Sequence, residues 1–150
     1  MRLAAAKPAD AAPLARIMAD WASETPWMPK LDAPQENQLV LSRLIATTDV
    51  TTLRNWRGPQ GFVARDGASI HALYLAPAAR ARGHGKRLLD HAKGQSDRLT
   101  LWCFQANTRA RSFYARQGFA EAGMTDGAGN DENIPDVQMV WMASAKDLEP

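Results

Sequence analysis

A glycine-rich turn in the middle of the chain has the residue types that hold a phosphate group. Gly83-His84-Gly85 stands between an apolar segment and a helical pattern, with Arg80, Arg82 and Lys86 close by. Glycine lets the main chain approach a ligand closely. The first N–H groups of a helix lack partners and, with the helix dipole, bind phosphate oxygens. The turn therefore predicts a site for a phosphorylated cofactor.

Two common nucleotide-binding loops do not fit this turn. In a P-loop, Arg80 would stand where the first glycine is required and Arg87 where a hydroxyl side chain is required. A dinucleotide-binding loop needs a third glycine where this chain has Leu88. On this motif alone, a tight strand-to-helix connection with no ligand remains the alternative.

A second motif follows about twenty residues later. Asn107, Ala110, Phe113-Tyr114 and Gln117 recur at helical spacing along one side of a helix, and Gly118-Phe119 comes directly after them. Asn107 is expected to cap this helix and the glycine to end it.

Together the two motifs resemble the signatures of the GCN5-related N-acetyltransferase (GNAT) superfamily. Arg80, Gly83 and Gly85 match its Arg/Gln-x-x-Gly-x-Gly/Ala signature, and the second motif matches Asn-x-x-Ala-x-x-Phe-Tyr-x-x-x-Gly-Phe at every position. The motifs stand in the family's order and at its usual separation. The resemblance implies an enzyme that uses acetyl-coenzyme A as acetyl donor and no metal, and that transfers the acetyl group directly to a primary amine.

The resemblance also implies where this cofactor lies. Main-chain N–H groups of the glycine turn would hold its pyrophosphate, and the preceding strand would pair with its pantetheine arm. An N–H near Leu73 would polarise the thioester carbonyl, and the imidazole of His84 is expected to face solvent. The residues expected on the cofactor are Leu73, Tyr74, Leu75, Arg80, Arg82, Gly83, His84, Gly85, Lys86, Asn107 and Phe113.

Two side chains are candidates for proton transfer. Tyr114, in the Phe-Tyr pair of the signature, is the candidate general acid that protonates the departing thiolate. Many family members carry a glutamate on the central strand as base, but residues 69–76 contain no acid. His71 stands there instead, in a segment that resembles the corresponding strand of arylalkylamine N-acetyltransferases. It is the candidate base, with a water chain or a purely structural histidine as alternatives.

The acceptor is expected at two connections that border the slot in this family. Glu24, Trp27 and Met28 lie in the first, and Asp131 and Glu132 in the second, where acidic side chains suit a cationic amine. A small-molecule amine is the first hypothesis for the acceptor. The alternatives are a protein or peptide acceptor, or a non-catalytic module that senses acetyl-coenzyme A.

Composition narrows the class of protein. The 150 residues suit one domain, 1–150. A net charge of +2 without a long basic cluster argues against nucleic acid as partner. Without an apolar run of membrane length, and with Cys103 as the lone cysteine, the sequence predicts a cytoplasmic protein with no membrane partner and no metal site. A homodimer is possible in such families.

Hydrophobic periodicity predicts the elements that position these residues. The expected fold is mixed α/β, in the order β-α-α-β-β-β-α-β-α-β-β, with a mostly antiparallel sheet and about four helices. The resemblance adds a splay between strand 69–76, expected to be buried on both faces, and strand 98–105. The other expected elements are strands 2–6, 50–56, 61–64, 119–124 and 137–142, a turn at 57–60, and helices from an Asp10 cap to about 22, 35–47, 85–93 and 108–117.

Overall fold

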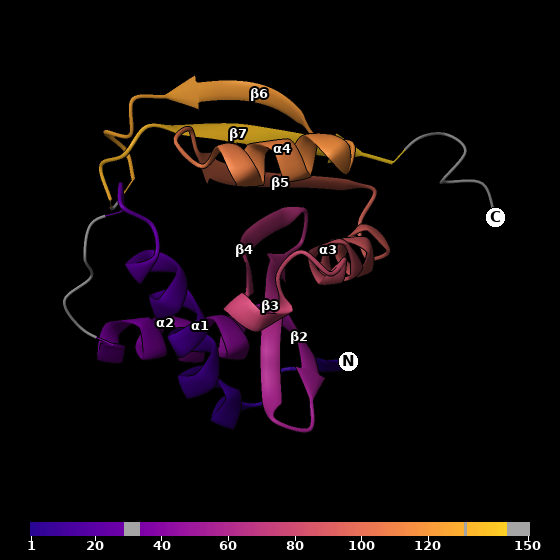
Figure 1. Ribbon diagram of the computed structural model, residues 1–150. Coiled ribbons are helices and arrows are strands. Elements are labelled where there is room, and N and C mark those ends of the chain that lie inside the picture. Colours follow the sequence, from indigo (N-terminus) through magenta and orange to yellow (C-terminus); the bar gives the residue numbers. More distant parts are fainter. Residues whose placement is uncertain (29–33, 131, 144–150) are drawn as a thin grey trace.

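The structure, a computed structural model, describes residues 1–28, 34–130 and 132–143, with main chain alone at residues 34 and 35. Figure 1 shows its elements, which follow the expected order. The strands are β1 (Arg2–Ala5), β2 (Asp49–Asn55), β3 (Gly58–Asp66), β4 (Ser69–Leu75), β5 (Arg98–Phe104), β6 (Ala120–Thr125) and β7 (Asp136–Met142). The helices are α1 (Ala11–Ser23), α2 (Pro34–Thr47), α3 (His84–Lys93) and α4 (Thr108–Arg116).

The strands form one seven-stranded sheet in the order β1-β2-β3-β4-β5-β7-β6. Every neighbouring pair is antiparallel except β4 and β5, which run parallel at the centre. The expected fold class is therefore confirmed. No helix in the described ranges is both long and apolar enough to cross a membrane.

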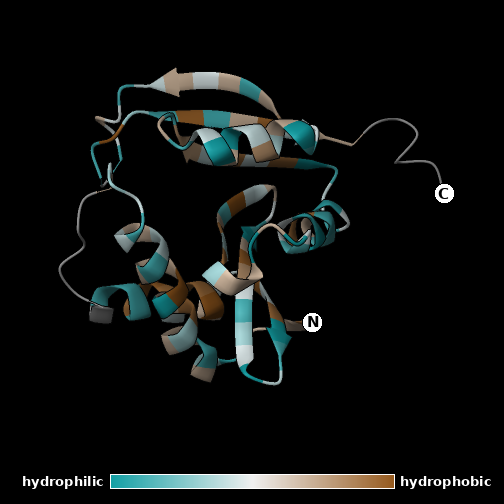
Figure 2. Ribbon diagram, in the orientation of Figure 1, coloured by the Kyte–Doolittle hydropathy of each residue, from teal (hydrophilic) through white to brown (hydrophobic). Residues whose placement is uncertain are grey.

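Two hydrophobic cores lie on opposite faces of this sheet. One contains Leu88 and Leu89 of α3 and Tyr114 of α4, packed against strands from both halves of the sheet. The other contains Leu14 of α1 and Leu41 of α2, packed against β2 and β3. Figure 2 shows hydrophilic and hydrophobic residues mixed along each helix, as expected for helices with one face on a sheet.

The centre of the sheet is only partly paired. Between β4 and β5 the register holds Ser69 opposite Thr100 and Ile70 opposite Leu101, and no further pair follows. On its other side, Ile70 and Ala72 of β4 pair with Arg65 and Ala64 of β3, which are adjacent in the sequence. His71 is therefore the extra residue of a β-bulge, which increases local twist and re-aims the chain. The expected splay between the two central strands is present and begins at this residue.

The expectation that strand 69–76 is buried on both faces is wrong. Ile70 is buried, but the residues from His71 onward are exposed or half-buried. They lie where β4 and β5 have separated, so one edge of the strand borders open space rather than a neighbour.

Two local expectations need correction. The first hairpin turns at Trp56-Arg57 rather than over 57–60, because the Asn55 side chain accepts a hydrogen bond from Arg57 N–H at 2.9 Å and β3 already begins at Gly58. Asp10 precedes α1 but makes no side-chain cap there. Its carboxylate instead accepts the N–H of Lys7 at 2.9 Å and pairs with Arg54 at 3.0 Å, tying the helix start to β2.

Candidate active site

A cavity of about 680 Å³ occupies the space between the separated strands. Its lining includes the glycine turn and the cationic side chains of Arg80, Lys86, Arg109 and Arg116. It also includes the aromatic side chains of Trp21, Tyr74, Trp102 and Phe104. The cavity therefore combines cationic and aromatic side chains, with β4 along its wall.

The glycine turn, which lines the cavity, has N–H groups without main-chain partners. Arg87 N–H makes the first main-chain bond of α3, to the Gly83 carbonyl at 3.2 Å. The N–H groups of the three residues before it have no carbonyl inside the helix to bind. Gly83 has φ +81° and Ala81 has φ +60°, so the chain turns through two left-handed positions just before the helix. Such a conformation is costly for alanine and is typical of functional loops.

Arg80 joins this turn to β4 and α1. Its Nε donates to the Leu75 carbonyl at 3.2 Å and its Nη1 pairs with Glu24, while Nη2 is buried with no partner among the described residues. His84 is half-buried, and its Nδ1 is buried without a hydrogen-bond partner among the described residues, so the expectation that its imidazole faces solvent holds only in part. Burial, with the cationic Arg87, the N-terminus and Arg82 nearby, lowers the pKa of His84.

The open edge of β4 offers main-chain groups to the cavity. The N–H of Ala76 donates to the Gln60 carbonyl of β3 at 2.7 Å. This bond fixes which residues of β4 direct their main-chain groups toward β3. Main-chain groups of alternate residues point to opposite sides of a strand, so those of Leu73 and Leu75 point away from β3. The Arg80 bond to the Leu75 carbonyl agrees with this direction. The N–H of Leu73 thus faces the slot, as the resemblance implies.

Helix α4 closes one wall of the cavity. Asn107 caps it as expected, with Oδ1 accepting from Ala110 N–H at 3.1 Å. Phe113 and Tyr114 line the cavity, and their rings meet each other at 5.3 Å in an edge-to-face arrangement. The ring of Phe113 also lies 3.4 Å from where a Cβ on Gly85 would stand. A side chain at Gly85 would therefore press against the Phe113 ring, and glycine leaves this space free.

Three weakly acidic groups face one another inside the slot. Burial raises the pKa of Tyr114 far above its usual value, and the nearby Cys103 and Tyr74 raise it further. Burial also raises the pKa of Tyr74 to about 12, with additional effects of Glu132 and Cys103. The Cys103 thiol has its pKa raised to about 11, mainly by burial. All three groups therefore keep their protons at neutral pH.

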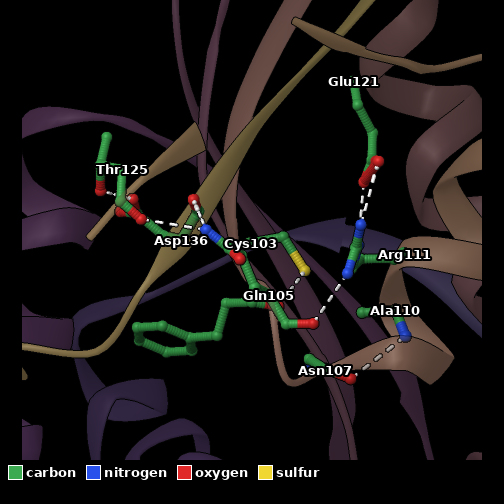
Figure 3. A network of polar contacts seen from close by, with 9 residues as sticks. Cys103, Gln105, Asn107, Ala110, Arg111, Glu121, Thr125 and Asp136 are labelled. Atoms are coloured by element: carbon green, nitrogen blue, oxygen red, sulfur yellow. Dashed lines mark hydrogen bonds and ion pairs between the residues drawn. The ribbon is translucent and has the colours of Figure 1, made fainter. Parts of the chain in front are cut away.

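The carboxylate of Asp136, at the start of β7, binds side chains at the start of and within the loop that follows β6. Asp136 is 8% exposed, and its carboxylate accepts from the Thr125 hydroxyl and from Asn130 Nδ2 at 3.2 Å. Gln105 Nε2 donates to the carbonyls of Thr125 and Asp136, both at 3.0 Å. Figure 3 shows this network next to the Arg111–Glu121 ion pair, whose arginine also donates to the Gln105 carbonyl. Asp136 is therefore a structural residue of the loop.

The predicted acceptor residues occupy different places. Trp27 contacts the rings of Trp21 and Phe104, while Glu24 is engaged by Arg80. Met28 is half-buried and closes a turn onto Thr25. Glu132 lies close enough to Tyr74 to influence its pKa, and Asp131 lies outside the described residues.

Several cavity residues were not predicted from the sequence. They are Trp21, Trp102, Cys103, Phe104, Arg109, Ala110, Arg116 and Gln117. The aromatic residues Trp102 and Phe104 of strand 98–105 are a signal in the sequence that could have indicated part of this lining. Within the described ranges, no group of three or more His, Cys, Asp or Glu residues is arranged to hold a metal ion.

Comparison with known proteins identifies the family. Residues 5–119 match the family described as acetyltransferase (GNAT) family. The chain belongs to this family. A curated relative, the peptidyl-lysine N-acetyltransferase YjaB of Salmonella typhimurium, is 35% identical over 68 residues, which cover 45% of this chain and 47% of that protein. The match spans about half the length of the first curated relatives.

Solved structures agree on the fold. The apo form of YjaB from Escherichia coli superposes with a TM-score of 0.76 at 20% identity, covering 96% of this chain and 100% of that chain. The structure of yncA from Salmonella typhimurium, described as a putative acetyltransferase with its cofactor acetyl-CoA, gives a TM-score of 0.72 at 15% identity, covering 96% and 94%. At these identities the likeness establishes the GNAT fold alone.

The residues of this chain fit the acetyl-coenzyme A that the family implies. Unpaired N–H groups at α3 and the orphaned Nη2 of Arg80 suit phosphate oxygens. The free edge of β4 suits the amide groups of a pantetheine arm. A Cβ built on Gly83 would meet no described atom within 4 Å, so no neighbouring side chain blocks the turn at this residue.

Replacing Gly83 by alanine should weaken coenzyme A binding about ten-fold, because a left-handed φ costs an L-residue about 1–2 kcal/mol and the turn would relax away from it. The matched control is Gly67→Ala, since Gly67 also has positive φ and open space but lies in the β3–β4 turn. Titration calorimetry with coenzyme A measures both affinities. Equal affinities in the two variants would show that the turn does not hold the cofactor.

Proposed function

We propose that this protein is an acetyl-coenzyme A-dependent N-acetyltransferase that acetylates a primary amine. The observation that carries the proposal is the separation of β4 from β5 after Ile70, directly beside a glycine turn with unpaired N–H groups. Family membership supports the same reaction. Acetyl-coenzyme A supplies the acetyl group as a thioester, and the chain's residues position it and move protons.

The main chain of β4 would stabilise the thioester carbonyl during the reaction. The N–H of Leu73 faces the slot, where it would donate to the thioester oxygen and stabilise the negative charge that develops there during amine attack. Because the bulge and the pairing with β3 fix this N–H in place, it would need no reorganisation during the reaction. Main-chain groups of Leu75 would hold the pantetheine arm, and those of the glycine turn would hold the pyrophosphate.

Tyr114 is the proposed general acid. Its ring is fixed against Phe113 and Phe119, and it lines the cavity beside Cys103. Because its pKa is raised, the phenol stays protonated throughout the neutral range and is ready to donate to the departing sulfur. A coenzyme thiolate formed in this apolar slot would be unstable without that proton.

His71 is the proposed general base. It is exposed, lines the cavity and occupies the bulge where β4 leaves β5. A protonated amine cannot attack a carbonyl, and imidazole is suited to accept its proton near neutral pH. The bulge places His71 at the start of the open segment, two residues before Leu73.

The acceptor is proposed to be either a small-molecule amine or a lysine side chain of a protein. The cavity itself favours the first, because it is large enough for a small amine beside the pantetheine arm. The name of the relative YjaB, a peptidyl-lysine N-acetyltransferase, favours the second. In both acceptors the group that reacts is a primary amine.

Replacing Tyr114 by phenylalanine should lower kcat about 100-fold, the usual contribution of a positioned general acid. Coenzyme A affinity should stay near that of the wild type, because the ring and its contacts remain. Release of free thiol over a panel of amines, polyamines, aminoglycosides and lysine peptides measures the rates. Tyr74→Phe removes the other hydroxyl and should lose much less. An unchanged kcat in Tyr114→Phe would remove Tyr114 as the acid.

His71→Gln should lower kcat/KM about 100-fold for an alkylamine, which must lose a proton before it attacks. The loss should be much smaller for an aromatic amine, which is already neutral at pH 7. Comparing both acceptors at one pH checks this. An equal loss for the two acceptors would mean that His71 has a structural role and that another group or water takes the proton.

A further inference from the structure

Arg80 forms a bridge between the open edge of β4 and the end of α1. Its Nε donates to the Leu75 carbonyl at 3.2 Å, and its Nη1 lies 2.5 Å from a carboxylate oxygen of Glu24. Glu24 is the residue that caps α1 at its C-terminal end. Because residues 24 and 80 are far apart in the sequence, only the folded chain brings these groups together. We refer to the side chains of Arg80 and Glu24 as the β4 latch.

The latch occupies a position that a neighbouring strand would fill in a continuous sheet. The main-chain groups of Leu75 point away from β3, toward the side on which pairing between β4 and β5 stops at Ile70. A neighbouring strand would place an N–H about 2.9 Å from the Leu75 carbonyl. The Nε of Arg80 stands at nearly this distance instead. Since Arg80 also lines the cavity, its guanidinium lies where the pantetheine arm is proposed to pair with β4.

The main chain on both sides of the latch is fixed by other contacts. The hydroxyl of Thr25 donates to the Trp21 carbonyl at 2.7 Å and closes the end of α1. Arg80 follows a short 3-10 turn at Pro77–Ala79, whose last residue is fully buried. The guanidinium can therefore leave the Leu75 carbonyl by rotation of its side chain, while α1 and β4 stay in place.

The contacts of the latch are weak enough for a ligand to replace them. The side chains of Arg80 and Glu24 are 27% and 46% exposed, and water screens an ion pair that is exposed to this degree. The Nη2 of Arg80 is buried without a hydrogen-bond partner among the described residues. A buried donor that lacks a partner destabilises the arrangement that buries it. The closed latch therefore leaves Arg80 incompletely satisfied.

We propose that the β4 latch closes the edge of β4 before the cofactor binds, and that the pantetheine arm opens it. An amide N–H of the arm replaces the Nε of Arg80 as the donor to the Leu75 carbonyl. The released guanidinium is then available to the diphosphate. The inference rests on the proposed acetyltransferase function, and it adds a competition between a side chain and the cofactor for one carbonyl.

Two compounds separate the arm of the cofactor from its phosphates. N-ethylpantothenamide carries both amides of the arm without a charge or a thiol, whereas ADP carries the diphosphate without the arm. Arg80→Met removes the donors of the latch and keeps a long side chain. It should tighten the binding of N-ethylpantothenamide about three-fold, the size of one weak competing contact, with no gain for ADP. Titration followed by NMR measures both affinities.

The same variant distinguishes a latch from a permanent brace. If Arg80 only supports the conformation of β4, Arg80→Met should bind N-ethylpantothenamide more weakly than the wild type. That result, or an unchanged affinity, would overturn the proposal.

Glu24→Gln tests the anchor of the latch. Loss of the carboxylate charge weakens the hold on Arg80, so N-ethylpantothenamide should bind about two-fold tighter. Because this compound is uncharged, a general change in electrostatic attraction does not affect the result. The matched control is Asp49→Asn, which removes the Arg65–Asp49 ion pair between β2 and β3 and should leave the affinity unchanged. Equal affinities in the two variants would overturn the role of Glu24.

The wild-type protein offers a measurement that needs no substitution. NMR follows the exchange of arginine Nε–H groups with water. Saturation with N-ethylpantothenamide should speed exchange at Arg80 at least about three-fold, because its Nε loses the Leu75 carbonyl. The internal control is Arg111, whose Nε donates to Glu121 at 2.8 Å and should exchange as before. Unchanged exchange at Arg80 in the presence of the bound compound would overturn the latch.

The outcomes separate the latch from the proposed function. If an amine is acetylated and N-ethylpantothenamide binds without disturbing Arg80, the latch is overturned while the acetyltransferase function stands. If folded wild-type protein binds neither coenzyme A nor N-ethylpantothenamide, the proposed function is overturned and the latch proposal with it.

Discussion

The two central strands of the sheet are held together at only two residue pairs, and the rest of the site depends on that limited pairing. After Ser69–Thr100 and Ile70–Leu101, β4 and β5 separate. The bulge at His71 coincides with this point, because the extra residue turns β4 relative to β3 just where its other neighbour is lost. The result is a strand edge without a neighbouring strand in the middle of a folded domain. Arg80 binds the Leu75 carbonyl on this edge, and the N–H groups of Leu73 and Leu75 are left to find a partner elsewhere.

The hydrophobic cores explain how the strands stay apart without the sheet falling into two pieces. The core beneath α3 and α4 includes Leu53 and Val63 from one half of the sheet and Leu99 and Val137 from the other, so it spans the split. The core beneath α1 and α2 involves only strands of the first half. On that second face the connection across the gap comes from aromatic rings, through Trp27 on Phe104. The first face therefore joins the two halves of the sheet through a shared core, and the second face joins them through these rings.

Much of this arrangement follows from local sequence, and the remainder depends on distant contacts. The glycine turn, the Asn107 cap and the element order are local features, and short-range rules predicted them correctly. The bulge at His71 and the exposure of β4 were not predictable in this way, because strand register depends on residues far apart in the chain. The turn at Trp56-Arg57 was misplaced because the Gly-Pro pair outweighed the Asn55 side chain, whose hydrogen bond to Arg57 fixes the turn. The network around Asp136 likewise depends on Gln105, thirty-one residues away.

Hydrogen exchange with and without coenzyme A tests the free edge of β4 most directly. The account predicts that added cofactor slows exchange at the amides of Leu73 and Leu75 and at those of residues 83–86, because each gains an acceptor. The amides of Tyr74 and Ala76 point to β3 and should change little. Protection of the turn alone, with Leu73 and Leu75 exchanging as fast as before, would contradict the idea that the separated strand edge receives the cofactor.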